Sequence, residues 1–450
     1  MEILNKNLRT EIIENFDNAK KVLSVLKNVG RLKSDETSDI FIDLLKHKSR
    51  DVRVEAVKHL GKFRDNNVIE DTLIAQFLSD DDSLVRRETI SSIGRQRNPD
   101  RISFFASVLQ DKDPKIVLQA IRSLLVFKDR KEVQIELKKI MSHPNEMIKQ
   151  VLEIELREKS DKKPKENSIK HQDVNPLLKN TTVNGDVLEI LKLIKEESFH
   201  LTFTSPPYYN ARDYSFYNSY QEYLDFLRNV FKETHRLTKE GRFLIVNTSP
   251  VIVPRVSRAH SSKRYPIPFD IHHFLMLDGW EFVDDIIWQK PEFAVKNRVG
   301  GFQQHRKPLA YKPNSLTEYL MVYRKKSDKL LDWNLKQYDE ETVNQSKVDD
   351  GFETTNVWRI DPVFDKTHSA VFPKGLCDRV LKYYSMKGDL VFDPFGGSGT
   401  FGEAAVNDER NYFLTEIDNV YFERIKERLS KLNIEKQFLS LSEFQKNLDR

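Results

Sequence analysis

The 450-residue chain contains one cysteine, Cys377, and no apolar run close to the roughly 20 residues that cross a bilayer. A single cysteine excludes a disulfide framework and any cysteine-rich zinc site, and it fits a reducing compartment. The first residues, MEILNKNLRTEIIENFDNAK, place acids and amides where a signal peptide requires an apolar segment. We therefore expect a soluble, cytoplasmic protein with no membrane partner, and no metal site.

Glycine and proline are also scarce, with 15 and 17 residues, while 39% of the chain is hydrophobic. This composition excludes collagenous and disordered classes and predicts two or three globular domains. The net charge of +4 is too mild to identify a nucleic-acid partner and does not exclude one.

A degenerate repeat occupies residues 1–158, which we predict to be α-helical. Its copies are LLKHKSRDVRVEAVKHLG, FLSDDDSLVRRETISSIG, VLQDKDPKIVLQAIRSLL and a weaker IMSHPNEMIKQVLEIEL. The superposed apolar positions are Val52, Val85, Ile116 and Met147, then Val57, Ile90, Ile121 and Leu152. Such units bury their apolar faces by stacking into a solenoid. The pattern resembles HEAT-type repeats, and a plain helical bundle is the alternative.

Arg53 and Arg86 recur at one position of the repeat and form either a basic ridge or a solvated face. The polar, lysine-rich segment 159–180 has no apolar periodicity, so we interpret it as a linker.

Segments of strand type and helix type alternate in residues 181–450, which we take as the second domain. The predicted strands are FHLTFT, RFLIVNT, WEFVDDIIWQK, LTEYLMVYRKK and DLVFDPF, and the predicted helices are YLDFLRNVFKETHRLT, FDIHHFLMLDGW and LCDRVLKYYS. This alternation predicts a doubly wound α/β sheet, in which ligands bind beyond the carboxyl ends of the strands.

A glycine-rich turn follows one of these strands in DLVFDPFGGSGTFGEAAV (389–406). Gly396, Gly397 and Gly399 suit a backbone that approaches a ligand closely or takes positive φ. The helix expected near Thr400 would present free N–H groups and a positive dipole end. No Gly-Lys-Ser/Thr is present, which excludes a Walker loop. The next strand ends in Glu416, whose carboxylate can accept both ribose hydroxyls of an adenosine.

Two competing interpretations of this turn are a connector without a ligand and a dehydrogenase. A dinucleotide fold needs several more βα units after its glycine-rich turn, whereas only about fifty residues remain here. The rest of the sheet must therefore come from upstream, in a permuted order.

The segment TSPPYYN (204–210) directly follows the predicted strand FHLTFT. Pro206 and Pro207 make a rigid corner without N–H groups, so their carbonyls are free to accept hydrogen bonds. Ser205 adds a hydroxyl acceptor and Tyr208 a flat ring. Together they suit a planar group with an exocyclic amine; a simple Pro-Pro turn is the alternative.

In this order the two motifs resemble those of the S-adenosylmethionine-dependent amino-methyltransferases of DNA, in their permuted β class. The resemblance runs from about Asn184 to Leu432 and includes NGDVLEIL, DDIIWQKP, NVWRI and HSAVFPKGLCDRVLKYYS. It implies a Rossmann-like sheet, S-adenosylmethionine as cofactor and double-stranded DNA as substrate. The implied catalytic residues are Ser205, Pro206, Pro207 and Tyr208. The implied cofactor-binding residues are Asp186 (adenine amino group), Phe372, Pro373, Asp393, Pro394, Phe395, Gly396, Gly397, Ser398 and Gly399 (methionine side), Thr400 (helix start) and Glu416 (ribose). Gly397 departs slightly from the family, which often has Ala-Gly or Cys-Gly there.

The implied target is an exocyclic amine, a poor nucleophile because its lone pair is delocalised into the ring. We expect the Ser205 hydroxyl and the Pro206 carbonyl to accept its hydrogens and so localise the lone pair. The base must first be flipped out of the duplex, and Tyr208 is placed to stack on it, whereas Tyr209 helps or packs. Methylation of a ring carbon would need a cysteine, and we expect Cys377 to be a packed helix residue.

Ser at the first position of the tetrapeptide goes mostly with N4 of cytosine in this family, and Asp with N6 of adenine. Ser205 therefore favours N4-cytosine, with N6-adenine as the alternative. Protein-glutamine enzymes favour Asn there and carry the cofactor loop first. An RNA substrate stays open, as does a helical-repeat binding protein whose methyltransferase half is inactive.

Two basic segments are candidate DNA contacts. Residues 291–330 hold nine basic and three acidic side chains, and residues 255–264 hold four basic and no acidic ones. The predicted DNA-binding residues are Arg255, Arg258, Lys263, Arg264, Arg298, His305, Arg306 and Lys307. We place the target-recognition region at about 297–347. Because this region is short, the solenoid would add DNA contacts or hold a partner such as a cognate restriction enzyme.

Overall fold

The computed structural model describes residues 9–28, 38–64, 66–156, 171–209, 217–253, 259, 262–294, 308, 313, 315–348, 351, 353–363 and 372–448. The chain divides into two compact units, Met1–Pro164 and Lys165–Arg450. No described helix is long and apolar enough to cross a membrane.

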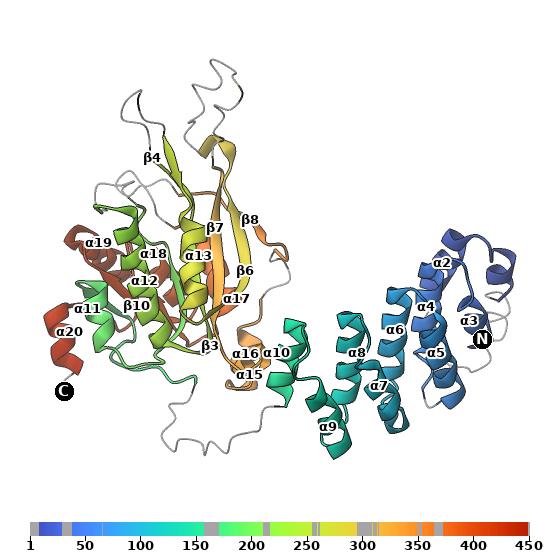
Figure 1. The fold of residues 1–450 in the computed structure, drawn as a ribbon. Coiled ribbons are helices and arrows are strands. Elements are labelled where there is room, and N and C mark those ends of the chain that lie inside the picture. The colour runs from blue at the N-terminus through green and yellow to red at the C-terminus, as the bar shows by residue number, and fades with distance from the viewer. Residues whose placement is uncertain are drawn as a thin grey trace. The chain divides into compact units, whose positions relative to one another are not determined.

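The first unit consists of paired helices (Figure 1). They are α2 (Ala19–Asn28), α3 (Ser38–Leu44), α4 (Arg50–Leu60), α5 (Asn67–Ser79), α6 (Ser83–Gly94), η2 (Pro99–Arg101), α7 (Ile102–Val108), α8 (Pro114–Leu125), α9 (Lys131–Lys139) and α10 (Glu146–Glu155). The polar residue before the second helix caps it in three of the copies: Asp82, Asp113 and Asn145 accept backbone N–H groups of α6, α8 and α10. Ser49, before α4 in the first copy, makes no such side-chain bond.

The superposed apolar positions form the core of this unit, with one exception. Val52, Val85 and Ile116 are fully buried, whereas Met147 is 60% exposed. The buried residue of the last copy is Ile148, one position later. The prediction for Met147 was wrong because Ile148 takes the inward-facing position of α10, while Leu152 is buried at its predicted position.

The recurring arginines do not form a free basic ridge. Arg53 Nε donates to Asp80 Oδ2 at 2.7 Å and Arg53 Nη2 donates to Asp80 Oδ1 at 3.0 Å. Arg86 makes the equivalent ion pair with Asp111. Each arginine therefore joins its own helix to the turn that opens the next repeat, and both are mostly buried.

The second unit contains a nine-stranded sheet in the order β11-β1-β10-β9-β2-β3-β7-β6-β8. The strands are β1 (Thr181–Asn184), β2 (Phe199–Thr204), β3 (Thr238–Thr248), β6 (Trp280–Gln289), β7 (Thr317–Lys325), β8 (Val357–Arg359), β9 (Leu390–Asp393), β10 (Asn411–Glu416) and β11 (Gln437–Ser440). A hairpin of β4 (Val251–Val253) and β5 (Lys263–Tyr265) follows β3. Within the nine-stranded sheet, all pairings are parallel except those of β7 with β3 and β6.

Helices cover both faces of this sheet (Figure 1). One face packs α11 (Val187–Leu193), α12 (Tyr220–Leu237), α13 (Ile267–Leu277) and α20 (Leu441–Leu448), and the other packs α17 (Lys374–Tyr384), α18 (Thr400–Asn407) and α19 (Asn419–Ser430). Alternate residues of a strand face opposite sides: Leu390 and Phe392 pack with the first set, and Val391 with the second. The doubly wound architecture and the predicted segments are confirmed, whereas the short strands β1, β8 and β11 were not predicted.

Part of the predicted linker belongs to this second unit. Leu178 is fully buried in its core, and Lys239 Nζ donates to the carbonyl oxygens of His171 and Asp173 at 2.6 and 2.5 Å. Residues 171–180 therefore belong to the second unit, anchored there by Leu178 and by the two bonds to Lys239, and residues 159–170 of the predicted linker lie outside the described residues.

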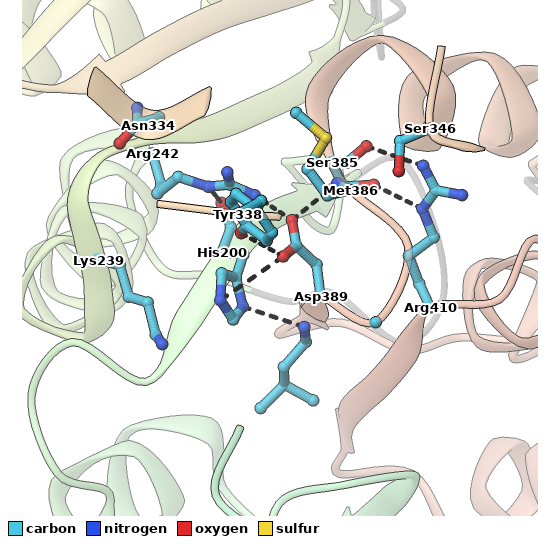
Figure 2. A network of polar contacts seen from close by, with 12 residues as sticks. His200, Lys239, Arg242, Asn334, Tyr338, Ser346, Ser385, Met386, Asp389 and Arg410 are labelled. Carbon is cyan, nitrogen blue, oxygen red and sulfur yellow. Dashed lines mark hydrogen bonds and ion pairs between the residues drawn. The ribbon is translucent and has the colours of Figure 1, made fainter. Parts of the chain in front are cut away.

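Buried charged groups meet near the amino ends of β2 and β9 (Figure 2). Asp389, which is 1% exposed, pairs with Arg242, which is 3% exposed. The carboxylate also accepts from Tyr338 Oη at 2.5 Å and from Met386 N at 2.8 Å. The neighbouring His200 donates from Nε2 to the His171 carbonyl and accepts from Leu390 N at Nδ1. Burial lowers the pKa of His200 to about 3, so its ring is neutral.

Candidate active site

The two sequence motifs meet where β2 and β9 lie side by side. The register pairs Leu201 with Val391 and Thr202 with Phe392, so both strands end at the same edge. Thr204 Oγ1 donates to Asp393 Oδ1 across this edge at 2.6 Å. The chain passes from β2 to β3 on one side and from β9 to β10 on the other, so the motifs flank the switch point of the sheet.

A cavity of about 550 Å³ opens at this edge. It is lined by every predicted catalytic and cofactor-binding residue except Pro373 and Gly399. Pro373 is buried and precedes α17, and Gly399 precedes α18. These two residues are chain neighbours of the lining residues Phe372, Ser398 and Thr400.

The glycine-rich loop takes the backbone conformations that its sequence suggests. Gly397 and Gly399 have φ of 53° and 77°, in the left-handed region that favours glycine. A Cβ on Gly396 would lie 3.2 Å from the Thr415 carbonyl oxygen. The loop thus lies tightly against β10, with the N-terminus of α18 beside the cavity.

Glu416 ends β10 and is tied to the loop. Its Oε2 accepts from Gly397 N at 2.8 Å and its Oε1 from Asp418 N at 2.9 Å. Burial raises the pKa of Glu416, although the two backbone N–H groups oppose that shift. Each oxygen retains a lone pair for a ligand.

Asp393 is the most perturbed acid of the cavity. Burial raises its pKa to about 7, and the nearby Glu416 adds to the rise, while Thr204 and the Phe395 N–H oppose it. The groups that act on this carboxyl are thus hydrogen-bond donors and another acid. A carboxyl with this pKa is partly protonated near neutral pH, and a cation that binds beside it would favour the charged carboxylate form.

Asp186 has a structural role that the sequence interpretation missed. Its Oδ1 caps α11 by accepting from Leu188 N at 2.8 Å and Glu189 N at 3.1 Å. The signal was present, because an aspartate directly before an apolar helix is a common N-cap. Asp186 also lines the cavity, so the cap holds its carboxylate in place there.

Tyr208 lines the cavity next to Ser205, and its hydroxyl is held from behind. Tyr208 Oη donates to Glu318 Oε2 at 3.3 Å. Burial raises the pKa of Tyr208, so the phenol stays protonated. Tyr209 is packed against Tyr220 and Tyr265 and does not line the cavity, which leaves packing as its role.

The sequence interpretation assigned no site role to three polar residues near Tyr208, namely Glu318, Lys290 and Asn247. Glu318, at the start of β7, pairs with Lys290 and accepts from Asn247 Nδ2 at 2.7 Å. Because β7 runs antiparallel, its first residues lie at the carboxyl edge of β3. That reversal has no local sequence signal, so Glu318 was counted only as an acid within the basic segment. Tyr217 and Phe226 of the cavity wall were also missed.

Cys377 is buried within α17, as predicted. Burial raises the pKa of its thiol well above the ordinary value, which disfavours the thiolate that a nucleophile requires.

Most of the predicted DNA contacts lie outside the described residues: Arg255, Arg258, Arg298, His305, Arg306 and Lys307. Lys263 and Arg264 are described and exposed on β5, where Lys263 Nζ lies 4.6 Å from the Tyr265 ring centroid. Arg264 Nη2 donates to the Pro313 carbonyl oxygen at 3.1 Å.

The structure reduces the basic surface expected over 291–330. Arg324 is 7% exposed and donates to the Gly241 carbonyl oxygen, and Lys325 donates to that of Thr238. Both lie at the end of β7 remote from the cavity, so they were wrongly grouped with phosphate contacts. The expected recognition region is affected too: α15 (Leu331–Leu335) and α16 (Glu340–Gln345) lie near Gly241 and Asp389, at the edge away from Ser205.

The cavity fits S-adenosylmethionine in size and in donor set. Its volume is typical of cofactor sites. Carboxylates of Asp186, Asp393 and Glu416 can meet amino, ammonium and hydroxyl groups, and Ile417 and Tyr421 offer apolar surface for an adenine. The close approach of Gly396 to β10 leaves the backbone of the loop facing the ligand.

An open α/β sheet with a glycine-rich loop at its switch point and an acid at the end of the next strand is the arrangement of nucleotide-binding α/β folds. Within that class, residues 199–427 match the family described as DNA methylase, the N6/N4 methyltransferases. This match covers half of the chain, so the chain belongs to that S-adenosylmethionine-dependent family. Residues 70–157 match HEAT repeats, which confirms the predicted repeat type there.

Named relatives are distant. The chain is 27% identical over 263 residues to the type II beta methyltransferase M.BslI of Bacillus sp. (strain NEB-606), covering 55% of this chain and 27% of that protein. It is also 27% identical over 282 residues to the type II methyltransferase M.Cfr9I of Citrobacter freundii, covering 55% and 87%. The solved PvuII DNA methyltransferase (cytosine-N4-specific) is 20% identical, with 60% and 92% covered and a TM-score of 0.43.

Proposed function

We propose that this protein methylates double-stranded DNA at the exocyclic amine of a flipped base, N4 of cytosine. The observation that carries the proposal is the meeting of Ser205 and the Asp393 loop in one cavity, across the β2–β9 edge. Names of the type II methyltransferase relatives agree with a role in a restriction–modification system.

S-adenosylmethionine supplies an electrophilic methyl group when bound. Glu416 would hold the ribose, Asp186 the adenine amino group, and Asp393 with Phe395 the methionine part. The family resemblance implies these assignments, and the presence of the acids and glycines in the lining of one cavity supports them. Because Asp393 has a pKa near 7, a cationic ligand beside it would favour its carboxylate form.

The target amine would lie against Ser205 and the carbonyl of Pro206. Both groups accept hydrogens, which localises the amine lone pair, and Pro206 and Pro207 keep the corner rigid because neither can donate or change φ freely. Tyr208 would stack on the flipped base. The gain in rate comes from positioning and electrostatics, without a covalent nucleophile, and Cys377 is buried.

The choice of N4-cytosine rests on Ser205 in the first position of the tetrapeptide. N6 of adenine is the second candidate, because a hydroxyl and a carbonyl acceptor suit either exocyclic amine. A helical-repeat binding protein with an inactive methyltransferase half is a third, and the intact polar lining of the cavity speaks against it.

Transfer of labelled methyl from S-adenosylmethionine to duplex DNA tests the proposal, with nucleoside mass spectrometry to identify the base. We expect N4-methylcytosine, and Ser205→Ala should lower the transfer rate by about 100-fold or more. Ser327→Ala is the matched control, since its hydroxyl serves Glu240 away from the cavity. Transfer to neither cytosine nor adenine refutes the function, N6-methyladenine refutes only the base, and a fully active Ser205→Ala refutes the role of Ser205.

A further inference from the structure

Two exposed elements of the second unit follow strands that end beside the catalytic corner, residues 205–208. One is the hairpin of β4 and β5, and the other is the 3-10 turn η3 (Glu292–Ala294), which comes after β6. Because β7 runs antiparallel to both β3 and β6, these two strands run parallel to each other. β3 is also parallel to β2, so the hairpin and the turn both lie at the edge of the sheet where the cavity opens (Figure 1).

The hairpin is attached to the catalytic corner by packed aromatic rings. The ring centroid of Tyr265 on β5 lies 4.9 Å from that of Tyr209, which is 8% exposed and directly follows Tyr208 in the chain. Lys263 and Arg264 precede Tyr265 on the same strand, and both are exposed. Two cationic side chains are therefore held beside the corner that would receive the base, where they suit the phosphates of a duplex.

The turn is attached to the same corner through polar contacts. Lys290, directly after β6, pairs with Glu318, and Glu318 Oε2 accepts from Tyr208 Oη at 3.3 Å. The backbone N of Lys290 also donates to the Leu316 carbonyl oxygen at 2.8 Å, so the chain that leaves β6 is held by both its backbone and its side chain. Phe293 comes three residues later, so its backbone lies within about 10 Å of this anchored point.

Phe293 is the most exposed large apolar side chain in the described part of the chain, at 87%. Single exposed apolar residues are common, so exposure by itself assigns no role. The position of Phe293 does so, because a base that leaves the stack opens a gap in the duplex, and apolar side chains can insert between base steps. Its neighbour Glu292 is exposed and acidic, which disfavours a phosphate contact at this turn and favours contact with bases.

We propose that Phe293 inserts into the duplex at the gap left by the flipped base, while Lys263 and Arg264 contact the phosphates beside it. The inference rests on the proposed function. The ring would stack on the base pairs next to the gap and replace part of the stacking that is lost when the target leaves the helix. It would thereby stabilise the flipped state without touching the cofactor or the target amine.

The variant Phe293→Ala tests the insertion on two forms of a duplex that the wild type methylates. In one form the target base is paired, and in the other it faces an abasic site, so that no pair is broken when the base leaves. We expect the single-turnover rate of methyl transfer to fall about 10- to 100-fold on the paired duplex, as for loss of one base–aromatic stacking contact. On the abasic duplex the loss should be less than about threefold, because flipping costs least for an unpaired base.

Three further variants separate insertion from charge and from folding. Phe293→Trp keeps a large ring and should retain the rate on the paired duplex to within about threefold. Lys263→Ala/Arg264→Ala should weaken binding to both duplexes alike and reduce the salt dependence of affinity, because phosphate contacts do not depend on base pairing. Leu330→Ala is the matched control: Leu330 is 77% exposed near the end of β7 remote from the cavity, and this variant should keep the full rate.

The outcomes are distinct. If the wild-type chain transfers no methyl to DNA, the proposed function is refuted and the insertion falls with it. If the wild type is active and Phe293→Ala keeps its rate on the paired duplex, the insertion alone is refuted. An equal loss on the paired and abasic duplexes also refutes it, because the ring then acts on a step other than flipping. If Phe293→Ala does not fold, Phe293→Ser decides by the same comparison. Unchanged affinity and salt dependence of Lys263→Ala/Arg264→Ala refute the phosphate contacts.

Discussion

Replacing Asp389 by Asn should destabilise the second unit strongly without changing the active site. The carboxylate is 1% exposed and holds Arg242, Tyr338 and the Met386 N–H together at the amino ends of β2 and β9 (Figure 2). Removing one partner of a buried ion pair costs about 3–5 kcal/mol, because the remaining charge, here Arg242, is buried and uncompensated. That is a large part of the roughly 5–15 kcal/mol typical of a domain and lowers Tm on the order of 10 °C.

Urea denaturation followed by tryptophan fluorescence measures this loss selectively. All four tryptophans, Trp280, Trp288, Trp333 and Trp358, lie in the second unit, so the helical repeats are silent in this signal. Glu427→Gln is the control: its pair with Lys431 is exposed on both sides, and such pairs contribute about 0–1 kcal/mol. Cofactor affinity at 25 °C should be unchanged, because the cavity lies at the opposite edge of the sheet.

The pH dependence of the free energy of unfolding gives a second check of the role of Asp389. Burial raises the pKa of Asp389, but the charge of Arg242 and the hydrogen bonds from Tyr338 and the Met386 N–H outweigh it, and the pKa lies below its ordinary value. A depressed folded-state pKa contributes stability that is present above the unfolded pKa and is lost as pH falls through the folded one. The difference between wild type and Asp389→Asn should thus be constant from pH 8 to about 5 and shrink below about 4. A difference under about 1 kcal/mol at pH 7 would contradict the uncompensated-charge argument.

Three further predictions concern the cavity and the domains. Gly399→Ala should weaken cofactor binding by calorimetry and cost about 1–2 kcal/mol of stability, since φ is 77° and the added Cβ would lie 3.3 Å from Ile425; unchanged affinity would contradict the role of the loop. Cofactor affinity should rise by up to about tenfold per pH unit as the pH rises towards 7, because the Asp393 carboxyl must lose its proton beside a cation. The free energy of unfolding of the ligand-free protein should fall from pH 4 to pH 7, because the pKa of Asp393 in the folded state is raised to about 7. Asp393→Asn should remove the pH dependence of both cofactor affinity and stability. If either quantity keeps its pH dependence in this variant, a group other than Asp393 is responsible. A chain limited to residues 165–450 should fold and bind cofactor with unchanged affinity, because it forms a compact unit of its own; a cofactor affinity reduced more than about threefold would show that the repeats support the site.

Local sequence patterns were sufficient for most elements and for the cofactor site. The strand before the glycine-rich turn, the helix at Thr400 and the acid at Glu416 were predicted from periodicity and spacing, and all three occur as predicted. These signals are local because a turn that needs positive φ needs glycine wherever it lies. The failures were also local in origin: Ile148 takes the buried position expected of Met147, and Asp186 has a capping role as well as a place in the cavity.

Other features depended on which strands became neighbours. The sequence order separates Ser205 from Asp393 by most of the second unit, and only the pairing of β2 with β9 brings them together. The antiparallel β7 carries Glu318 to Tyr208 and takes Arg324 and Lys325 to the remote edge, which local composition could not distinguish. Composition and periodicity specify elements because they act over a few residues. The register of a sheet is decided by long-range packing of both its faces, and that packing placed the chemistry of this protein.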